Sequence, residues 1–147
     1  MSKFTFILGL AGSGKSHLAM EMKKKDENLI IIDDAFHPTQ NKDTFPKDLE
    51  KLKQAVLNNQ DAAIIEGAFC FKDFRDPMND YLKSLFPSVV FEWVCFERDV
   101  TKANKNLYNE DRKHRDPEGH ENMNKVSVNK YTYPDNCKVI PIFEKKL

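Results

Sequence analysis

Residues 9–16 read Gly-Leu-Ala-Gly-Ser-Gly-Lys-Ser, and this segment constrains the fold more than any other part of the chain. The pattern G-x-x-x-x-G-K-S is that of a phosphate-binding loop, the Walker A motif. Glycines let the backbone turn several N–H groups inward, toward phosphate oxygens. Lys15 adds a positive charge for the β- and γ-phosphates, and the Ser16 hydroxyl is a ligand for Mg²⁺. The predicted nucleotide contacts are Gly9, Ala11, Gly12, Ser13, Gly14, Lys15, Ser16 and His17.

The flanking residues have the pattern that this loop requires. The segment 3–8 is apolar and rich in β-forming residues, which predicts a buried strand. After the loop, Leu18 and Met22 are four residues apart, and three lysines follow at 23–25, as expected at the C-terminal end of a helix. A glycine-rich turn without a ligand is the alternative, but such a turn does not need a Gly-Lys-Ser ending.

Composition narrows the class of protein. The chain has 147 residues and a formal net charge of zero, so no global field attracts it to nucleic acid or membrane. Its cysteines, Cys70, Cys95 and Cys137, are widely separated and odd in number, which favours a reducing compartment. No apolar stretch approaches the roughly 18 residues that span a bilayer, and no signal peptide is visible. We therefore expect a single cytoplasmic domain over residues 1–147.

The rest of the chain alternates between two patterns. Apolar runs that predict strands lie at 29–32, 62–65, 89–96 and 138–143. Helices are expected from about Thr44–Pro46, from Asp76-Pro77, after the capping residue Asp99, and over about 122–129. Residues 109–122 are charged and lack large apolar side chains, which indicates an exposed segment or lid. Alternating strands and helices predict an α/β fold, a parallel sheet covered by helices on both faces. Pro141 cannot donate to a ladder, so its strand is expected at an edge.

Polar side chains follow the predicted strands. Asp33 and Asp34 come after the second strand, Glu66 after the third and Arg98 after the fourth. In parallel sheets, ligands bind beyond the carboxyl ends of the strands. These residues and the phosphate-binding loop are therefore expected around one cleft.

On these residues the chain resembles the small P-loop kinases of the nucleoside-monophosphate-kinase-like group, including polynucleotide kinase, zeta-toxin-like kinases and short predicted kinases of bacteria and their viruses. The resemblance implies a five-stranded parallel sheet in the order 2-3-1-4-5, within a three-layer α/β/α arrangement. It implies that Asp33, or alternatively Asp34, accepts the proton of the attacking hydroxyl. It also implies a lid whose arginines, Arg112 and Arg115, cover the phosphates.

Several residues keep two interpretations. Glu66 is either a contact to the Mg²⁺ water shell or a capping or substrate-side carboxylate. Arg75 is a candidate contact to an acceptor phosphate, and Arg98 either faces the cleft or pairs with Glu97 or Asp99. The phenylalanines Phe69, Phe71 and Phe74 either stack an acceptor base or belong to the core. The histidines show no metal-ligand spacing.

The sequence thus predicts an ATP- and Mg²⁺-dependent kinase that transfers the γ-phosphate to a hydroxyl or phosphate. Acceptors that fit are a nucleotide, a nucleic-acid end or a small metabolite, with no role for a membrane. The alternative is a P-loop ATPase or nucleotide-binding switch module that acts through a protein partner.

Overall fold

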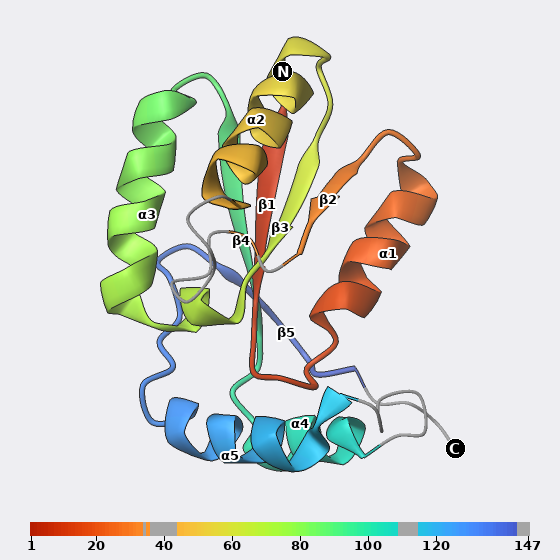
Figure 1. Cartoon of the computed structure of the whole chain (residues 1–147), viewed down its shortest axis with the longest axis vertical. Coiled ribbons are helices and arrows are strands. Elements are labelled where there is room, and N and C mark those ends of the chain that lie inside the picture. The colour runs from red at the N-terminus through yellow and green to blue at the C-terminus, as the bar shows by residue number, and fades with distance from the viewer. Residues whose placement is uncertain (34, 36–43, 109–114, 144–147) are drawn as a thin grey trace.

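Five parallel strands form the centre of the structure, a computed structural model that describes residues 1–33, 35, 44–108 and 115–143 (Figure 1). The strands are β1 (Lys3–Leu8), β2 (Ile30–Ile32), β3 (Ala62–Ile65), β4 (Val90–Phe96) and β5 (Lys138–Ile140). The helices are α1 (Lys15–Lys25), α2 (Thr44–Leu57), α3 (Lys72–Leu85), α4 (Val100–Leu107) and α5 (Pro117–Ser127), with a 3₁₀ helix, η1 (Gly67–Cys70).

The strand order is β2-β3-β1-β4-β5, and every neighbouring pair is parallel. The predicted order is therefore confirmed, and β5 lies at an edge as expected. Strand β1 is central, and Phe4, Phe6 and Ile7 on it are completely buried. Both faces of a central parallel strand are covered by neighbouring layers, which explains why this strand is apolar almost throughout.

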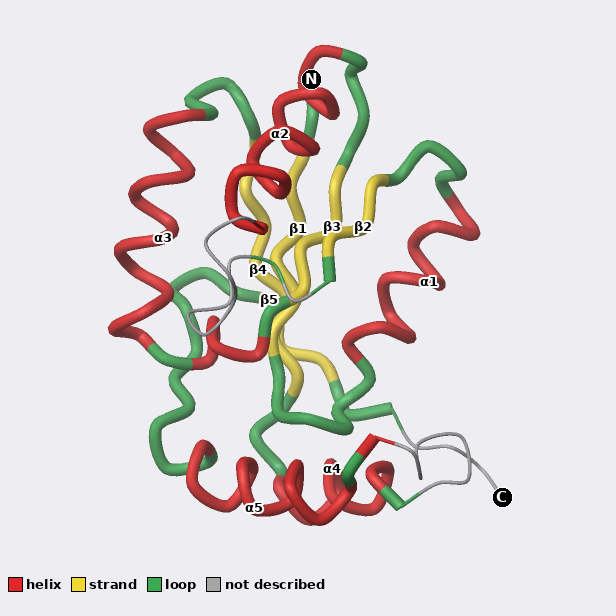
Figure 2. Tube along the Cα trace, viewed as in Figure 1, coloured by secondary structure: helices red, strands yellow, loops and turns green. Residues whose placement is uncertain are grey.

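Helices lie on both sides of the sheet and at one of its ends. Figure 1 shows the strands between α1 on one side and α3 on the other, and Figure 2 shows the same arrangement by secondary structure. Helices α4 and α5 pack together at the carboxyl ends of β1 and β4. This end of the sheet is where the sequence predicts a ligand.

Aromatic rings form much of the core on the α3 side. Phe6 stacks on Trp93 with ring centroids 4.4 Å apart, and Phe69 meets both rings edge to face. Phe69 is completely buried. Of the two interpretations of Phe69, the core role is the one observed.

Two helices begin earlier than the sequence predicts. Helix α3 starts at Lys72 rather than at Asp76-Pro77, so Pro77 lies inside the helix. A proline there removes one helical hydrogen bond, and packing of Phe74 on Phe69 helps to hold the added turn. Helix α5 starts at Pro117 instead of about 122, because the Asp116 side chain accepts from the Gly119 N–H and caps it.

The other boundaries agree closely. Asp99 caps α4 by accepting from the Lys102 N–H, as predicted. Strand β5 ends at Ile140, so Pro141 follows the ladder rather than belonging to it. All three cysteines are free thiols. Across the described ranges, no helix combines the length and apolar character that a bilayer crossing requires.

Candidate active site

The segment between β1 and α1 has the backbone geometry of the predicted loop. Gly12 and Gly14 have φ angles of +87° and +108°, a region that side-chain-bearing residues rarely adopt. A Cβ on Gly12 would lie 2.3 Å from the Ala103 carbonyl oxygen, so backbone space also requires glycine there. Gly14 precedes Lys15 at the N-terminus of α1, whose dipole and N–H groups favour an anion.

The Lys15 ammonium lies over its own loop. Its Nζ donates to the carbonyl oxygens of Gly9 at 2.8 Å and Leu10 at 3.0 Å. The side chain thus stays within the loop, at the place where the motif would present it to phosphates.

Two oxygen-bearing side chains, Ser16 and Asp33, lie close together where the loop faces β2. The Ser16 hydroxyl donates to Asp33 Oδ2 at 3.4 Å, and Asp33 directly follows β2. Mg²⁺ is commonly bound through one or two protein oxygens together with substrate phosphates and water. The Ser16 hydroxyl therefore fits a magnesium ion shared with a triphosphate, and Asp33 lies beside it.

Glu66 ends β3 and is 2% exposed. Its Oε1 accepts from the Ala68 N–H at 2.8 Å and caps η1, which is the capping role kept as one interpretation. Glu66 also lines the cavity described below. Its contact to a metal or substrate stays a prediction.

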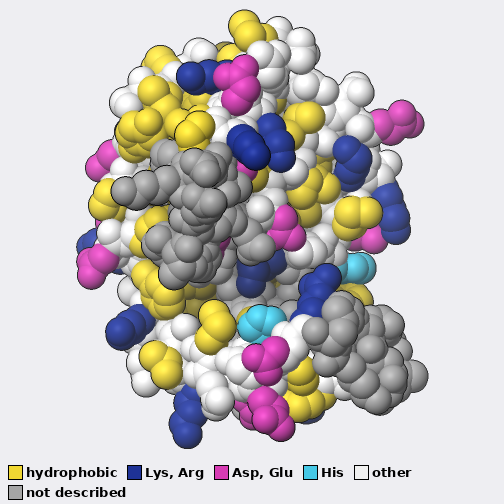
Figure 3. Space-filling view, in the orientation of Figure 1, with side chains coloured by type: hydrophobic (Ala, Val, Ile, Leu, Met, Phe, Trp, Pro, Cys, Tyr) yellow, Lys and Arg dark blue, Asp and Glu magenta, His cyan; other side chains and the backbone are white. Residues whose placement is uncertain are grey.

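A cavity of about 850 Å³ lies at this end of the sheet. Its volume is in the upper part of the range for ligand sites, roughly 300–1,000 Å³. Figure 3 shows charged and histidine side chains gathered in the middle of the face that it opens to. Of the predicted site residues, those that line it are Gly9, Ala11, Gly12, Gly14, Lys15, Ser16, His17, Asp33, Glu66 and Arg115.

Ser13 and Arg75 are not among the lining residues. The Ser13 side chain is completely buried, and its N–H donates to the Leu10 carbonyl. Arg75 is 3% exposed, and its guanidinium donates to the carbonyl oxygens of Phe69 and Thr132. The structure gives no support to the predicted acceptor-phosphate role of Arg75, because this arginine joins α3 to the segment that precedes β5.

The other arginines take different positions. Arg115 is exposed and precedes α5. Arg98 donates to the Tyr131 carbonyl, whereas Glu97 pairs with Lys102, so the predicted local pairing of Arg98 does not form. Two predicted site residues, Asp34 and Arg112, and with them much of the predicted lid, lie outside the described residues.

Sequence reasoning missed the asparagines that hold the loop. Asn124 of α5 is buried; its Oδ1 accepts from the Ala11 N–H at 3.0 Å and its Nδ2 donates to the Ala11 carbonyl at 2.8 Å. Asn106 of α4 donates to the Gly12 carbonyl at 2.8 Å. No local pattern marks an amide that binds backbone about a hundred residues away in the chain.

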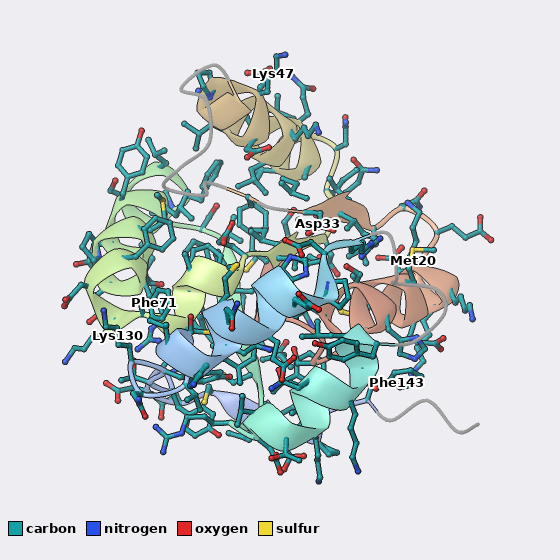
Figure 4. All side chains as sticks on the ribbon, turned by 60° about the horizontal axis from the view of Figure 1, so that its bottom comes forward. Met20, Asp33, Lys47, Phe71, Lys130 and Phe143 are labelled. Carbon is teal, nitrogen blue, oxygen red and sulfur yellow. The ribbon has the colours of Figure 1, made fainter. Side chains whose placement is uncertain are left out.

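The ring of Phe143 covers the other side of the loop. It stacks on His17 with centroids 4.0 Å apart, and its N–H donates to the Ser13 carbonyl at 3.0 Å. Figure 4 shows Phe143 and Phe71 well apart from each other, Phe143 near α4 and Phe71 near α3. The cavity lining therefore has one aromatic residue at the loop and another beyond the carboxylates.

Cys70 is the cysteine that lines the cavity. Burial raises the pKa of its thiol to about 11, so the group is protonated at neutral pH. A protonated thiol is a poor nucleophile, and this site has no thiolate chemistry at Cys70.

No protein-family model matches the sequence, and no curated protein matches it. Several solved structures do resemble the structure of this chain. A fungal RNA kinase aligns with a TM-score of 0.68 at 13% identity, over 99% of this chain and 77% of that one. A gluconokinase from Sinorhizobium meliloti aligns with a TM-score of 0.61 at 15% identity, over 97% of this chain and 84% of that one.

An APS kinase from Mycobacterium tuberculosis, solved with AMPPNP and APS, aligns with a TM-score of 0.54 at 15% identity, over 95% of this chain and 90% of that one. All three are P-loop kinases. The chain therefore has the fold of the small P-loop kinases.

Proposed function

We propose that the protein is an ATP- and Mg²⁺-dependent kinase. The observation that carries the proposal is a single cavity in which the phosphate-binding loop and Asp33 lie together, with further room beyond the carboxylate. A hydrolytic switch needs the loop, but it does not need a base with space for an acceptor. The likeness in fold to an RNA kinase, a gluconokinase and an APS kinase supports the same conclusion.

The triphosphate would lie along the loop. Backbone N–H groups at the N-terminus of α1 and the Lys15 ammonium would bind the β- and γ-phosphates. Ser16 and Glu66 would hold Mg²⁺, which when bound would neutralise charge on the phosphates. Arg115, and Arg112 in the same role, would bind phosphate oxygens from the lid side.

Asp33 would act on the acceptor. Its carboxylate orients the acceptor hydroxyl and takes its proton as the oxygen attacks the γ-phosphorus. The bond from the γ-phosphorus to the bridging oxygen breaks, and ADP leaves with that electron pair. Asp34 remains the alternative base.

The first test is transfer of labelled γ-phosphate from ATP, with Mg²⁺, to nucleosides, nucleotides, 5′-hydroxyl DNA and RNA, and sugars. Label on one acceptor class supports the kinase. Label that appears only as free phosphate in every pool contradicts the kinase and supports the ATPase or switch module.

Asp33→Asn tests the proposed base. We expect the turnover number to fall by about 10²–10⁴, the range for loss of a general base. The KM for ATP should change far less, since the loop is intact. Asp34→Asn is the comparison: if it loses transfer while Asp33→Asn retains it, the base is Asp34.

A further inference from the structure

The cavity lining changes in chemical character beyond Asp33. On the loop side it is formed by glycines, Lys15 and Ser16 together with Leu10 and Phe143, whereas the lining from η1, α3 and α5 includes a group of apolar side chains. These apolar lining residues are Ala68, Cys70, Phe71, Phe74 and Met123. The two ends of the site are therefore built for different groups.

Phe71 supplies a ring at the apolar end. It precedes α3, is half-buried, and has no ring-to-ring contact with any of the described residues. Phe74 differs, because it stacks on the core residue Phe69 with centroids 5.6 Å apart. Phe74 is thus held against a core ring, whereas Phe71 packs against the core at its edge and lines the cavity without a ring partner among the described residues.

Met123 faces the same cavity from α5 and is 56% exposed. Its neighbour Asn124 is bound to Ala11, so the backbone position of Met123 is fixed relative to the loop. His120 and Ser127 lie on the same helix face and also line the cavity. Thioether sulfur packs well against aromatic rings, and the two flanking side chains add hydrogen-bonding groups.

Cations of the described lining lie away from Phe71. They are Lys15, which is bound to its loop, and Arg115, which precedes the end of α5 that points toward α1 in Figure 1. Ser127 is the last residue of α5, and this end of the helix lies on the side of α3. Arg75 is buried against backbone carbonyls. Within the described lining, a phosphate or carboxylate placed beside Phe71 would lose hydration without the pairing that Lys15 and Arg115 offer nearer the loop.

We propose that the acceptor is the hydroxyl of a molecule with an uncharged planar ring, of the nucleoside type. The ring lies between Phe71 and Met123, and the hydroxyl points to Asp33. An acceptor phosphate, as in a nucleoside monophosphate, and a sugar acid are both disfavoured. This inference rests on the proposed kinase activity and adds the acceptor class to it.

The reaction balances without another reagent. The acceptor oxygen forms a bond to the γ-phosphorus, the bond to the β–γ bridging oxygen breaks, and ADP takes the electron pair. The hydroxyl proton passes to Asp33 and then to solvent. The ring-bearing group itself is unchanged.

The test compares acceptors in the full chain with Mg²⁺ and ATP. The acceptors are thymidine and 2′-deoxyadenosine as free nucleosides, a 5′-hydroxyl oligothymidylate as a strand end, dTMP and AMP as phosphate acceptors, and D-gluconate. We expect label on the nucleosides, the strand end or both, and the comparison of these two arms identifies the source of the ring. Preferential phosphorylation of gluconate, dTMP or AMP would overturn the acceptor class and leave the kinase standing.

Variants test the ring site separately from catalysis. Phe71→Ala and Met123→Ala should each raise the KM for the acceptor about ten- to a hundredfold, and Phe71→Leu should do so as well because leucine is not planar. Phe71→Tyr should retain the KM within about threefold. Val126→Ala is the matched control, since Val126 is an exposed α5 residue that does not line the cavity.

The KM for ATP reports whether the nucleotide site is intact in each variant and should stay within about threefold. Acceptor KM values that are unchanged in Phe71→Ala and Met123→Ala would overturn the ring site. If ATP is only hydrolysed in all pools, the proposed function fails, and the acceptor class fails with it.

Discussion

Gly12 has less room for a side chain than its conformation alone would suggest. Its positive φ already disfavours an L side chain by about 1–2 kcal/mol. The Ala103 carbonyl, 2.3 Å from the position of an added Cβ, belongs to α4 backbone and cannot rotate away. A side chain at Gly12 therefore has to separate the loop from α4.

Gly12→Ala should lower the free energy of unfolding by at least about 2 kcal/mol, the sum of the backbone penalty and the displacement of α4. Gly67→Ala is the matched control, because no atom lies within 4 Å of an added Cβ there and its φ is not positive. Its effect should stay within about 0.5 kcal/mol. Urea denaturation of both variants measures the difference, and equal losses would show that the contact with Ala103 is unimportant.

Helices α4 and α5 hold the phosphate-binding loop in place. Asn124 makes two hydrogen bonds to Ala11 and a third to Asn104 of α4. The Tyr108 hydroxyl at the end of α4 donates to Glu121 of α5, which joins the two helices again. This hydrogen bond raises the pKa of Tyr108 to about 12. The helix that carries Met123 is thereby fixed to the loop.

Asn124→Asp should disrupt this arrangement, because a carboxylate cannot donate to the Ala11 carbonyl or the Asn104 oxygen. We expect a loss of about 1–3 kcal/mol of stability and a higher KM for ATP. Asn122→Asp places the same charge on the exposed part of α5 and should change stability by less than about 0.5 kcal/mol. Thermal melts and ATP titrations of the pair check this, and similar losses would attribute the effect to charge alone.

Glu97 joins three elements, since it follows β4 and its Oε1 accepts from Lys102 of α4 and from the Ile142 N–H after β5. The Lys102 hydrogen bond, followed by the Ile142 N–H, holds the pKa of Glu97 below its usual value of 4.5. The unfolded chain therefore binds more protons near that pH. The stabilisation is present above about pH 4.5 and is lost as the pH falls through the lower folded pKa.

Glu97→Gln should cost roughly 0.2–1 kcal/mol at pH 7, as expected for an exposed ion pair. The difference from the unmodified chain should shrink as the pH falls from 5 to 3. Denaturant unfolding across this range measures it, with the exposed Glu27→Gln as control. A difference that is constant with pH would mean that the Glu97 charge does not contribute.

The sequence predicted the elements that local chemistry determines. The loop and the Asp99 cap follow from patterns within a few residues, whereas the strand order was implied by the resemblance. Contacts between polar groups that are far apart in the chain do not follow from such local patterns. Asn124 bonding to Ala11 and the burial of Arg75 against Thr132 depend on how α5 and α3 meet other segments. The early start of α3 likewise depends on packing around Phe69, which offsets a proline that locally favours a helix start.

At the scale of the whole molecule, the phosphate-binding loop contacts several elements that are otherwise far apart in the chain. It follows β1, begins α1, and contacts α4, α5 and the segment after β5 through Gly12, Ala11 and Ser13. A ligand bound to the loop should therefore stabilise the entire described fold rather than one element.

A non-hydrolysable ATP analogue with Mg²⁺, at about 100 times its Kd, should stabilise the protein by about 2.7 kcal/mol and raise the Tm by roughly 5–10 °C. Lys15→Ala should abolish most of this shift at the same concentration. Scanning fluorimetry measures both proteins. An equal shift in Lys15→Ala would contradict nucleotide binding at this loop.

The edge strands β2 and β5 are each three residues long, and β5 carries Lys138 and is followed by Pro141. A neighbouring chain that docks on such an edge finds few unpaired backbone groups, and proline offers no N–H at all. These edges therefore offer little backbone with which a strand of another molecule could pair. The shortness of these strands should therefore protect concentrated solutions of the protein against edge-to-edge aggregation.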